Sequence, residues 1–424
     1  MGKDAAETIT GSAYGAPGLA CQRVGWLHGG MTPTPFGTPL AHGAIRVLLL
    51  GAGELGKELA ISFQSLGVEV VACDRYEHAP AMQVAHRAYV VDLLDANALR
   101  AIIEAEQPSL IVPELDAINT EELAEFESRG FKVAPSASAA RVTMDRARTR
   151  LLVAEELGLP TSPYRIAESV DEVKAAVEEL GMPVIVKPLM SSSSKGQAVI
   201  RDVSECESAW RHASEDGRAA SARVIVESVV NFDYEVTLLT VRHISGTTFM
   251  DPIGHIQGDA GFRESWQPQP MSQAAALEAR RIASTVTDAL GGWGVFGVEL
   301  FVRGDEVIFS EISPRPHDTG IVTLASNPTH EFAIHVRAVL GLPVHHVNAE
   351  PAAACVLVAE GSGVPTFHGV ADALSRPDTD LRLFGKPRVD GRRRVGVALA
   401  RGATVEDARA RAAEAAGSIT ITLE

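Results

Sequence analysis

Cysteine is scarce in this sequence, and its spacing argues against the sites that cysteine usually builds. The 424 residues include four cysteines, Cys21, Cys73, Cys206 and Cys355, which are scattered and form no Cys-x-x-Cys pair. A disulfide framework or a zinc site is therefore not expected, and a reducing cytoplasm is the natural setting. Long apolar runs are missing as well, since none approaches the ~20 residues of a membrane-spanning helix.

Excess positive charge is also absent. The formal net charge is −16 and the pI is near 5.3, which argues against a general binder of nucleic acid or of membrane surfaces. Seven of the 38 basic residues are lysine, and three of these, Lys187, Lys195 and Lys386, fall within the motifs described below. The apolar fraction of 46% and the charged fraction of 22% are typical of a globular enzyme with two or three domains.

The first part of the chain differs in composition from the rest. Residues 1–41 are rich in Gly, Ala, Pro, Ser and Thr and show no periodic pattern. The segment lacks the basic start and the apolar stretch of a signal peptide. We predict a mostly disordered leader over residues 1–41.

Alternating apolar residues on both sides of a turn at 303–306 predict a β-hairpin. With Arg303 opposite Val307, Glu299 and Glu311 face each other on one side of the sheet. Two carboxylates in this position repel each other unless a proton or a cation lies between them. Mg²⁺ prefers oxygen ligands and usually binds one or two carboxylates together with substrate phosphates. The hairpin therefore predicts a Mg²⁺–nucleotide site, and a solvated hairpin face with two unrelated acids is the alternative.

A glycine-rich turn, Gly51-Ala-Gly-Glu-Leu-Gly56, lies between an apolar run at 45–50 and a predicted helix. A second apolar run ends in Asp74, so the segment resembles the dinucleotide fingerprint of a βαβ unit. The same glycines would also serve if they only allowed a tight turn and close helix packing. Glu54 stands at the helix start, where a carboxylate is poorly placed beside a pyrophosphate. This weakens the interpretation as a nicotinamide-dependent oxidoreductase.

Further acids and cations are expected near the ends of predicted elements. The predicted strand 109–114 ends in Glu114, and the carboxyl ends of parallel strands line the ligand crevice of such sheets. Glu54 and Glu114 are therefore expected at one crevice, with a solvated loop acid as the alternative for Glu114. A single helix is predicted over 143–157. Its arginines mostly form a solvated basic face in this interpretation, and one of them is able to reach a phosphate.

A lysine followed by a serine-rich loop marks the middle of the chain. Lys187 ends a predicted strand, and small residues, hydroxyls and backbone N–H groups at 191–197 suit a cover over phosphates. A flexible serine-rich linker is the alternative. Glu227 ends the next predicted strand and Glu235 follows it, so these acids can bind an adenine amino group or ribose hydroxyls. Backbone groups of 228–230 can serve the edge of the ring.

Two segments of the second half are also relevant to a site. Residues 254–270 are polar and aromatic, and we predict a loop near the site there. The segment 384–394 gathers five cations in an otherwise acidic chain. A solvated basic turn is one interpretation, and a phosphate cradle for a second, non-nucleotide substrate is the other.

The strand-end lysine, the small-residue loop and the paired glutamates, in this order, resemble the ATP-grasp superfamily. Segments reading LLGAGELGKE, IVPE, VIVKPLMSSSSKGQ, GVELFV, FSEISPRPHDTG and RLFGKP resemble more closely the formate-dependent glycinamide ribonucleotide formyltransferases. The resemblance implies an α/β fold with an N-terminal doubly wound (Rossmann-like) domain, an ATP-grasp lid and core, and a C-terminal α+β part. We expect the N-terminal domain at 42–142, the lid with its connecting helix at 143–224, and the core with the C-terminal part at 225–424.

The same resemblance implies an activity. Mg·ATP activates formate as formyl phosphate, and the amine of glycinamide ribonucleotide attacks it in a step of purine biosynthesis. It also implies a homodimer, and neither nucleic acid nor a membrane is expected as a partner. The nearest alternative is an ATP-grasp carboxylase that uses bicarbonate on another purine intermediate. A catalytically inactive nucleotide-binding module is disfavoured, because every expected ligand is present.

Carried over residue by residue, the resemblance assigns roles to named positions. It implies that Glu299 and Glu311 bind Mg²⁺ and that Lys187 neutralises the transferred phosphoryl group. The implied ATP contacts are Arg146, Lys187, Ser192, Ser193, Ser194, Lys195, Gly196, Gln197, Glu227, Ser228, Val229, Val230 and Glu235. The implied contacts to glycinamide ribonucleotide are Glu54, Leu55, Glu114, Asp318, Lys386, Arg393 and Arg394. No covalent nucleophile and no general base can be named from the sequence.

The sequence departs from the family pattern at two places. Ser194 stands where the family loop usually has glycine, and a residue with a Cβ resists positive φ. Loop closure over ATP is therefore expected to be altered. The leader before residue 42 has no counterpart in the family.

Overall fold

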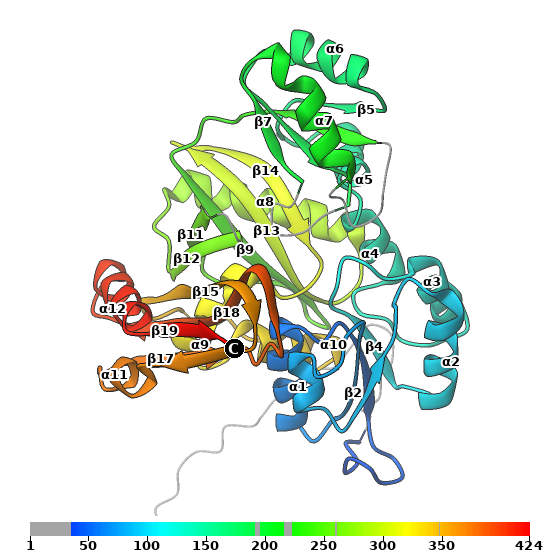
Figure 1. The fold of residues 1–424 in the computed structure, drawn as a ribbon. Helices are drawn as coiled ribbons and strands as arrows, with labels where there is room; N and C mark the ends of the chain where they lie inside the picture. The colour runs from blue at the N-terminus through cyan, green and yellow to red at the C-terminus, as the bar shows by residue number, and fades with distance from the viewer. Residues whose placement is uncertain (1–34, 191–195, 216–222, 259–260, 347) are drawn as a thin grey trace, which may run out of the picture. The chain divides into compact units, whose positions relative to one another are not determined.

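The computed structural model describes residues 35–424 except 191–195, 216–222, 259–260 and 347. The elements named below all lie in one compact unit, Phe36–Glu424 (Figure 1). In this part of the chain each helix is too short or too polar to serve as a membrane span. Most of the predicted leader lies outside the described residues, as do Ser192, Ser193, Ser194 and Lys195 of the serine-rich loop.

The N-terminal part is built around a parallel four-stranded sheet in the order β3-β2-β1-β4. The strands are β1 (Arg46–Leu50), β2 (Glu69–Asp74), β3 (Arg87–Val90) and β4 (Leu110–Pro113). The helices are α1 (Glu54–Ser65), the 3₁₀ helix η1 (Pro80–Gln83), α2 (Ala96–Glu106) and α3 (Thr120–Ser128). Val47 and Leu49 of β1 enter one hydrophobic core, while Leu48 and Leu50 enter another. The predicted parallel sheet with two buried faces is thus confirmed.

Three short helices follow where the sequence predicted one helix over 143–157. They are α4 (Ala137–Thr143), α5 (Arg146–Arg150) and the π-helical η2 (Leu151–Glu156). The side chain of Asp145 accepts hydrogen bonds from the backbone N–H groups of Ala147 and Arg148. The helical backbone then runs without a break from Arg146 to Glu156, so the predicted helix is confirmed except that it begins three residues later than predicted. Asp145 caps this later start and places Arg146 in the first turn of α5.

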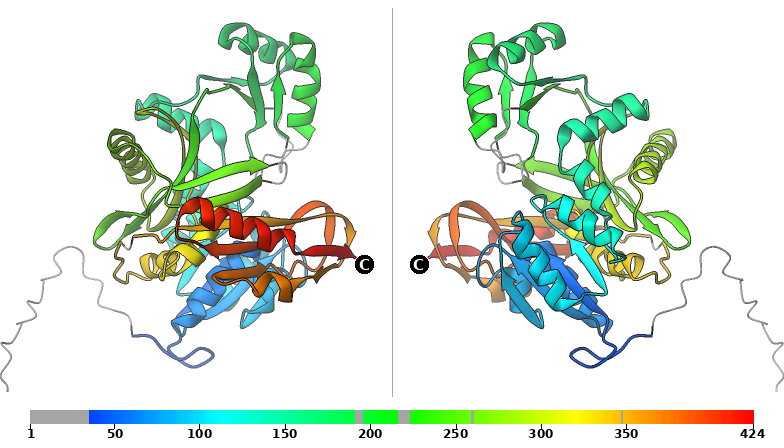
Figure 2. Two further views of the ribbon diagram at one scale, coloured as in Figure 1. Left: turned by 90° about the vertical axis from the view of Figure 1, so that its left-hand side faces the viewer. Right: turned by 90° about the vertical axis from the view of Figure 1, so that its right-hand side faces the viewer.

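A second, antiparallel four-stranded sheet has the order β5-β8-β6-β7. Its strands are β5 (Tyr164–Ala167), β6 (Val184–Pro188), β7 (Ala198–Ile200) and β8 (Val224–Ser228). Two helices, α6 (Val170–Leu180) and α7 (Cys206–Glu215), cover one face of this sheet, and η3 (Val203–Glu205) precedes α7 (Figure 2). Val177 of α6 shares a hydrophobic core with Val184 of β6 and Val226 of β8. Strand β8 spans the position, between residues 224 and 225, at which the sequence analysis placed the boundary between lid and core. That domain boundary stays a prediction.

The rest of the chain forms a nine-stranded sheet in the order β14-β13-β9-β11-β12-β15-β18-β17, with β10 paired to β9. Its strands are β9 (Tyr234–His243), β10 (Gly246–Phe249), β11 (Ile253–Gly258), β12 (Gly261–Gln267), β13 (Gly294–Arg303), β14 (Glu306–Ser313), β15 (Ala352–Gly363), β17 (Thr379–Leu383) and β18 (Val389–Arg401). A separate pair is β16 (Pro365–His368) with β19 (Thr420–Leu423).

Helices cover the large sheet and connect its strands. They are α8 (Gln273–Leu290), η4 (Asp318–Val322), α9 (Thr323–Ser326), α10 (Glu331–Val339), α11 (Val370–Leu374) and α12 (Val405–Gly417). Helix α8 buries Ile282 and Val286 against Phe296 and Val298 of β13, which leaves the opposite face of β13 free to carry Glu299. The acids predicted for the site therefore stand on a rigid, well-packed strand.

The predicted β13–β14 hairpin is present, but its turn is shorter than predicted. Arg303 pairs with Glu306, and the predicted pairing of Arg303 with Val307 is wrong. The turn consists of Gly304 and Asp305, and Gly304 adopts a φ of 58° that suits a two-residue hairpin turn.

A bulge in the same hairpin restores the predicted pairing of the two acids. Leu300 pairs with Phe309, whereas Glu299 pairs with Glu311, so the register shifts by one residue at Ser310. The extra residue offsets the shorter turn. The predicted placement of Glu299 opposite Glu311 is confirmed.

The predicted loop at 254–270 is wrong, because β11 and β12 form a hairpin there. His255 pairs with Ser265, and both side chains are buried. Polar residues thus occupy the buried face of these strands. The apolar alternation that signals a half-buried strand is missing, and the sequence looked like a loop.

Candidate active site

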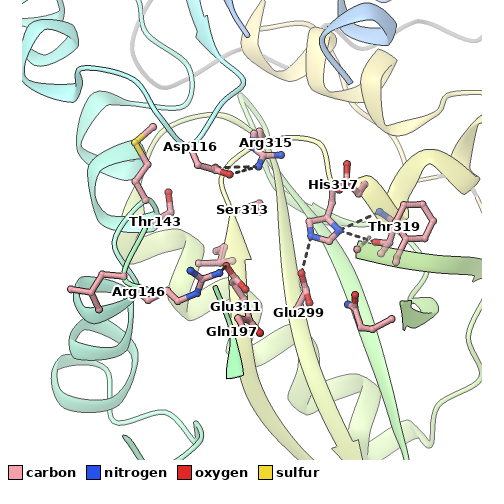
Figure 3. A pocket seen from close by; sticks show the side chains of 17 residues that line it. Asp116, Thr143, Arg146, Gln197, Glu299, Glu311, Ser313, Arg315, His317 and Thr319 are labelled. Atoms are coloured by element: carbon pink, nitrogen blue, oxygen red, sulfur yellow. Dashed lines mark hydrogen bonds and ion pairs between the residues drawn. The ribbon is translucent and has the colours of Figure 1, made fainter. Parts of the chain in front are cut away.

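Glu299 and Glu311 both line a cavity of about 130 Å³, named here the acidic cavity. Arg146 of α5, together with Arg315 and His317 from the segment after β14, completes much of its wall (Figure 3). Glu311 Oε1 lies 3.3 Å from a terminal nitrogen of Arg146. The two carboxylates that the hairpin predicted therefore open onto one space, with Arg146 beside Glu311 and His317 beside Glu299.

His317 orients Glu299. Its Nε2 lies 2.8 Å from Glu299 Oε1, and its Nδ1 lies 2.8 Å from the hydroxyl of Thr319 (Figure 3). Burial by itself raises the pKa of Glu299, but the hydrogen bond and charge of His317 outweigh it and hold the pKa at about 2. Burial lowers the pKa of His317, and the bond to Glu299 raises it above its usual value. Glu299 is thus ionised and fixed in direction.

The carboxylate oxygens of Glu299 and Glu311 are suitable ligands for a hard divalent cation. Glu299 and Glu311 offer carboxylate oxygens from adjacent strands, and Mg²⁺ is usually held by one or two such groups plus substrate oxygens. The side chain of Glu311 is 43% exposed, so the cation has access from the cavity. The residues present therefore fit the predicted Mg²⁺ site.

A buried ion triad holds Lys187 at the end of β6. Glu227 of β8 accepts a hydrogen bond of 2.6 Å from Arg150 Nε, and its other oxygen lies 2.6 Å from Lys187 Nζ. Burial raises the pKa of Glu227, but Arg150 and Lys187 together lower it to about 2. The triad lines a small recess that also includes Arg146 and Glu311, so it adjoins the acidic cavity.

A second hollow, of about 690 Å³, lies between the carboxyl ends of β1 and β2 and the segment 386–393. Glu54, Lys386 and Arg393 line it together with Arg75 and Tyr76, and we name it the mixed-charge hollow. Lys386 Nζ lies 3.1 Å from Glu54 Oε1. Three of the residues assigned to the second substrate therefore share one hollow.

Arg394 joins the two spaces. It forms an ion pair with Asp318, which lines the acidic cavity, and lies 3.6 Å from Glu54 of the mixed-charge hollow. Burial raises the pKa of Asp318, but Arg394 lowers it below its usual value. Arg394 is itself buried, so it is a partner of acids here and not an open cradle.

Glu114 and Leu55 are buried, and their chain neighbours Leu115 and Glu54 line the mixed-charge hollow. Burial raises the pKa of Glu114 well above its usual value, and the charge of nearby Arg315 opposes this shift. Arg315 forms an ion pair of 2.9 Å with Asp116. The side chain of Leu55 is buried in the hydrophobic core, so a substrate contact of this residue would come from its backbone.

The acid of the dinucleotide fingerprint is engaged by the protein itself. Asp74 is buried, and its two oxygens accept the backbone N–H groups of Ala52 and Arg75, each at 2.8 Å. A Cβ at Gly51 would stand 2.8 Å from Glu114 Oε2, so this glycine makes room for Glu114. Asp74 also lines the mixed-charge hollow, so these hydrogen bonds anchor its carboxylate without removing it from the hollow.

The remaining predicted ATP contacts are spread along the second and third sheets. Gln197 lines the acidic cavity, and Gly196 before it has a φ of 71°. Ser228 ends β8, with Val229 and Val230 directly after it. Glu235 on β9 places Oε2 3.3 Å from His255 Nε2. These positions stay predicted contacts.

Four residues that sequence reasoning did not single out belong to the site. They are Arg150, His255, Arg315 and His317. Three of them contact a predicted site acid, and Arg315 lines the acidic cavity. The segment PRPHD contains two of them, and its arginine and histidine next to Asp318 were the signal available. For Arg150 and His255, no local pattern points to the partner, because each partner lies far away in the sequence.

Three family models match the chain. A ribonucleotide synthetase preATP-grasp domain matches residues 45–144, an ATP-grasp domain matches 152–332, and a domain described as "PurT, C-terminal" matches 351–419. The predicted ATP-grasp fold with a preceding α/β domain and a C-terminal part is thereby confirmed.

Known proteins resemble the chain over nearly its whole length. The formate-dependent phosphoribosylglycinamide formyltransferase of Nitratidesulfovibrio vulgaris (strain DP4) is 62% identical over 390 residues, which cover 92% of this chain and 99% of that protein. The solved glycinamide-RNase-transformylase T from Mycobacterium tuberculosis is 37% identical, with a TM-score of 0.73 over 88% of this chain and 100% of that one. An N5-carboxyaminoimidazole ribonucleotide synthetase in complex with ADP is 25% identical, with a TM-score of 0.79 over 91% and 98%.

Proposed function

The chain belongs to the family of formate-dependent phosphoribosylglycinamide formyltransferases, and on this premise we propose how its residues perform that reaction. The enzyme uses ATP to activate formate and transfers the formyl group to the amine of glycinamide ribonucleotide, in purine biosynthesis. A formate oxygen attacks the γ-phosphorus of ATP, and ADP leaves. The amine then attacks the carbonyl carbon of formyl phosphate, and phosphate leaves with that oxygen.

One observation carries this proposal: three charged compartments are connected by residues that they share or that pair across them. The Lys187 recess and the acidic cavity share Arg146 and Glu311. The acidic cavity and the mixed-charge hollow are linked through Asp318, Arg394 and Glu54. A triphosphate in the first compartment can thus meet a second phosphate-bearing substrate from the third, with formate between them.

Lys187 and Arg146 act on the phosphates of ATP. Both cations are paired with carboxylates, Lys187 with Glu227 and Arg146 with Glu311, and phosphate oxygens accept the same charge-assisted hydrogen bonds from them. Mg²⁺, held by Glu299 and Glu311, would neutralise charge on the phosphate oxygens. His317 keeps Glu299 turned toward that position. The adenosine end would lie along Glu227 to Val230, with Glu235 at the ribose.

The mixed-charge hollow receives the ribonucleotide. Lys386 and Arg393 would bind its 5′-phosphate, because Lys386 and Arg393 line one space open to solvent. Asp318 is held ionised by Arg394 and opens onto the acidic cavity. Its carboxylate would therefore orient the substrate amine toward the activated formate.

The test is the release of ADP, followed with formate, with bicarbonate or with neither, in the presence and absence of glycinamide ribonucleotide. Turnover that needs both formate and the ribonucleotide supports the proposal. Equal or faster turnover with bicarbonate would instead identify a carboxylase. The high identity to formyltransferases against 25% to the ribonucleotide synthetase favours formate.

A homodimer is part of the proposal. It follows from the family resemblance and is tested by light scattering of the purified protein. A mass twice that of the 44.9 kDa chain is expected, and a monomeric mass across the working concentration range would contradict it.

A further inference from the structure

Side chains that bind metals form a row on one face of the nine-stranded sheet. The pairing of β9 with β11 and β13 puts His255, Glu235 and Glu299 on the same face, and Glu311 on β14 continues the row. The predicted Mg²⁺ pair uses one end of this row. The other end, Glu235 with His255, is unassigned as a metal site.

Three ligand atoms gather at that end. One atom from each of Glu235, His255 and Glu299 lies within 4.8 Å of the other two. Atoms that share one cation at bond lengths of about 2.0–2.2 Å stand about 3–4 Å apart. Small side-chain adjustments would thus bring all three into contact with one ion.

The surroundings of His255 leave one nitrogen free to act as a ligand. Its side chain is fully buried, and Nδ1 lies 3.5 Å from the hydroxyl of Thr237. With the proton on Nδ1, the lone pair of Nε2 points into the cluster. Nε2 makes no hydrogen bond to any residue that the structure describes, although Glu235 Oε2 lies 3.3 Å away. A proton on Nε2 or a cation between the two atoms would each remove the repulsion between facing lone pairs, and the two carboxylates of the cluster supply the charge that attracts a divalent ion.

We propose that Glu235, His255 and Glu299 bind a divalent transition-metal ion such as Mn²⁺ when no nucleotide is present. An imidazole nitrogen beside two carboxylates suits Mn²⁺ or Zn²⁺, whereas Mg²⁺ prefers oxygen ligands alone. The proposed site differs from the Mg²⁺ pair because it includes an imidazole nitrogen. The two sites share Glu299, but Glu311 belongs only to the Mg²⁺ pair.

The shared ligands make the two metal sites compete. Glu299 belongs to the proposed Mg²⁺ site and Glu235 to the proposed ribose contact, so Mg·ATP should displace the bound ion. This consequence rests on the proposed function. The binding of Mn²⁺ to the nucleotide-free protein does not.

The decisive experiment titrates Mn²⁺ into the full-length, chelator-treated, nucleotide-free protein and follows it by electron paramagnetic resonance. We expect one Mn²⁺ per chain, bound at least about tenfold more tightly than Mg²⁺, with spin-echo modulation from an imidazole nitrogen. His255→Gln should remove the nitrogen modulation and weaken binding by about tenfold or more. Wild-type protein without nitrogen modulation, or with equal affinity for Mg²⁺ and Mn²⁺, would overturn the proposal.

Two matched variants show which residues matter. His346→Gln changes a 40% exposed histidine near Asp251 and should leave Mn²⁺ binding unchanged. Glu311→Gln should also leave nucleotide-free Mn²⁺ binding unchanged, although it disables the proposed Mg²⁺ pair. Loss of Mn²⁺ in Glu311→Gln would place the ion at the Mg²⁺ pair and refute the separate site. If His255→Gln does not fold, Glu235→Gln tests the same site.

Discussion

Carboxylates in this site are paired with the cations that the substrates need. Glu227 lies between Arg150 and Lys187, at 2.6 Å from each, and Glu311 lies beside Arg146. Because Arg150 balances the charge of Glu227, Lys187 keeps positive charge for a phosphate. The pKa of Glu227, about 2, keeps this arrangement in place at neutral pH.

Replacing Arg150 by methionine tests that balance. Glu227 would then bind Lys187 more strongly, and less positive charge would face ATP. We expect the KM for ATP to rise about tenfold, which corresponds to about 1.4 kcal/mol of binding, with a smaller change in kcat. Arg148→Met, a 57% exposed position on the same helix, is the control. An unchanged KM for ATP in Arg150→Met would show that Arg150 only fills space.

The Glu311→Gln variant tests the pair of carboxylates, Glu299 and Glu311, that is proposed to bind Mg²⁺. The change removes one negative charge from the proposed Mg²⁺ ligands while keeping the shape, so we expect kcat to fall at least about a hundredfold. The side chain is 43% exposed, so the melting temperature should change little. Glu306→Gln on the same strand is the control. Full activity in Glu311→Gln would end the assignment of this residue as a metal ligand.

Arg393→Ala tests the phosphate end of the mixed-charge hollow. Arg393 lines the hollow, whereas Arg394 is buried against Asp318, so the single variant is cleaner than a change of both. We expect the KM for glycinamide ribonucleotide to rise about tenfold or more and the KM for ATP to stay within about twofold. Steady-state kinetics with each substrate varied in turn gives both values. Equal increases in both KM values would argue against a ribonucleotide phosphate here.

Whole elements show where sequence patterns predict structure and where they do not. The strands β1, β2 and β4 were predicted from short apolar runs. Such runs indicate strands buried on both faces, and both faces of this sheet are buried in the structure. The β11–β12 hairpin was missed because its buried face carries polar residues such as His255. The helix predicted over 143–157 begins only at Arg146, because Asp145 caps it there.

Strand β2 also depends on a buried acid that can be tested by pH. Glu69 is fully buried, and its carboxylate accepts hydrogen bonds from Arg46 at 2.8 Å and Arg87 at 2.6 Å. Burial raises the pKa of Glu69, but these bonds lower it to about 2. A lowered pKa means that the stabilisation is present above about pH 4.5 and is lost as the pH falls toward about 2.

Glu69→Gln should therefore lower the free energy of unfolding at pH 7 by about 2–3 kcal/mol. The difference from wild type should shrink as the pH falls below about 4.5, because wild-type Glu69 then takes up a proton on unfolding. Urea unfolding of both proteins across this pH range measures it. Glu125→Gln, at a 49% exposed position paired with Arg100, is the control. A difference that is independent of pH would contradict the role of the charge.

At the scale of the whole molecule, the site exists only where distant parts of the chain meet. Glu54 at the start of α1 contacts Lys386 near the C-terminus, and Arg315 after β14 contacts Asp116 after β4. Sequence reasoning placed most acids and cations at strand ends, because ligands bind there in such folds. It could not find Arg150 or His255, because their partners are set by tertiary pairing and not by spacing along the chain.

The central claim is that formate is activated by phosphoryl transfer before the amine attacks it. Formate labelled with ¹⁸O, supplied with ATP and glycinamide ribonucleotide, tests this most directly by mass spectrometry of the released phosphate. One labelled oxygen is expected in each phosphate, because the attacking formate oxygen leaves with phosphorus. Phosphate free of label during steady formylation would show that formate is not phosphorylated before the amine attacks.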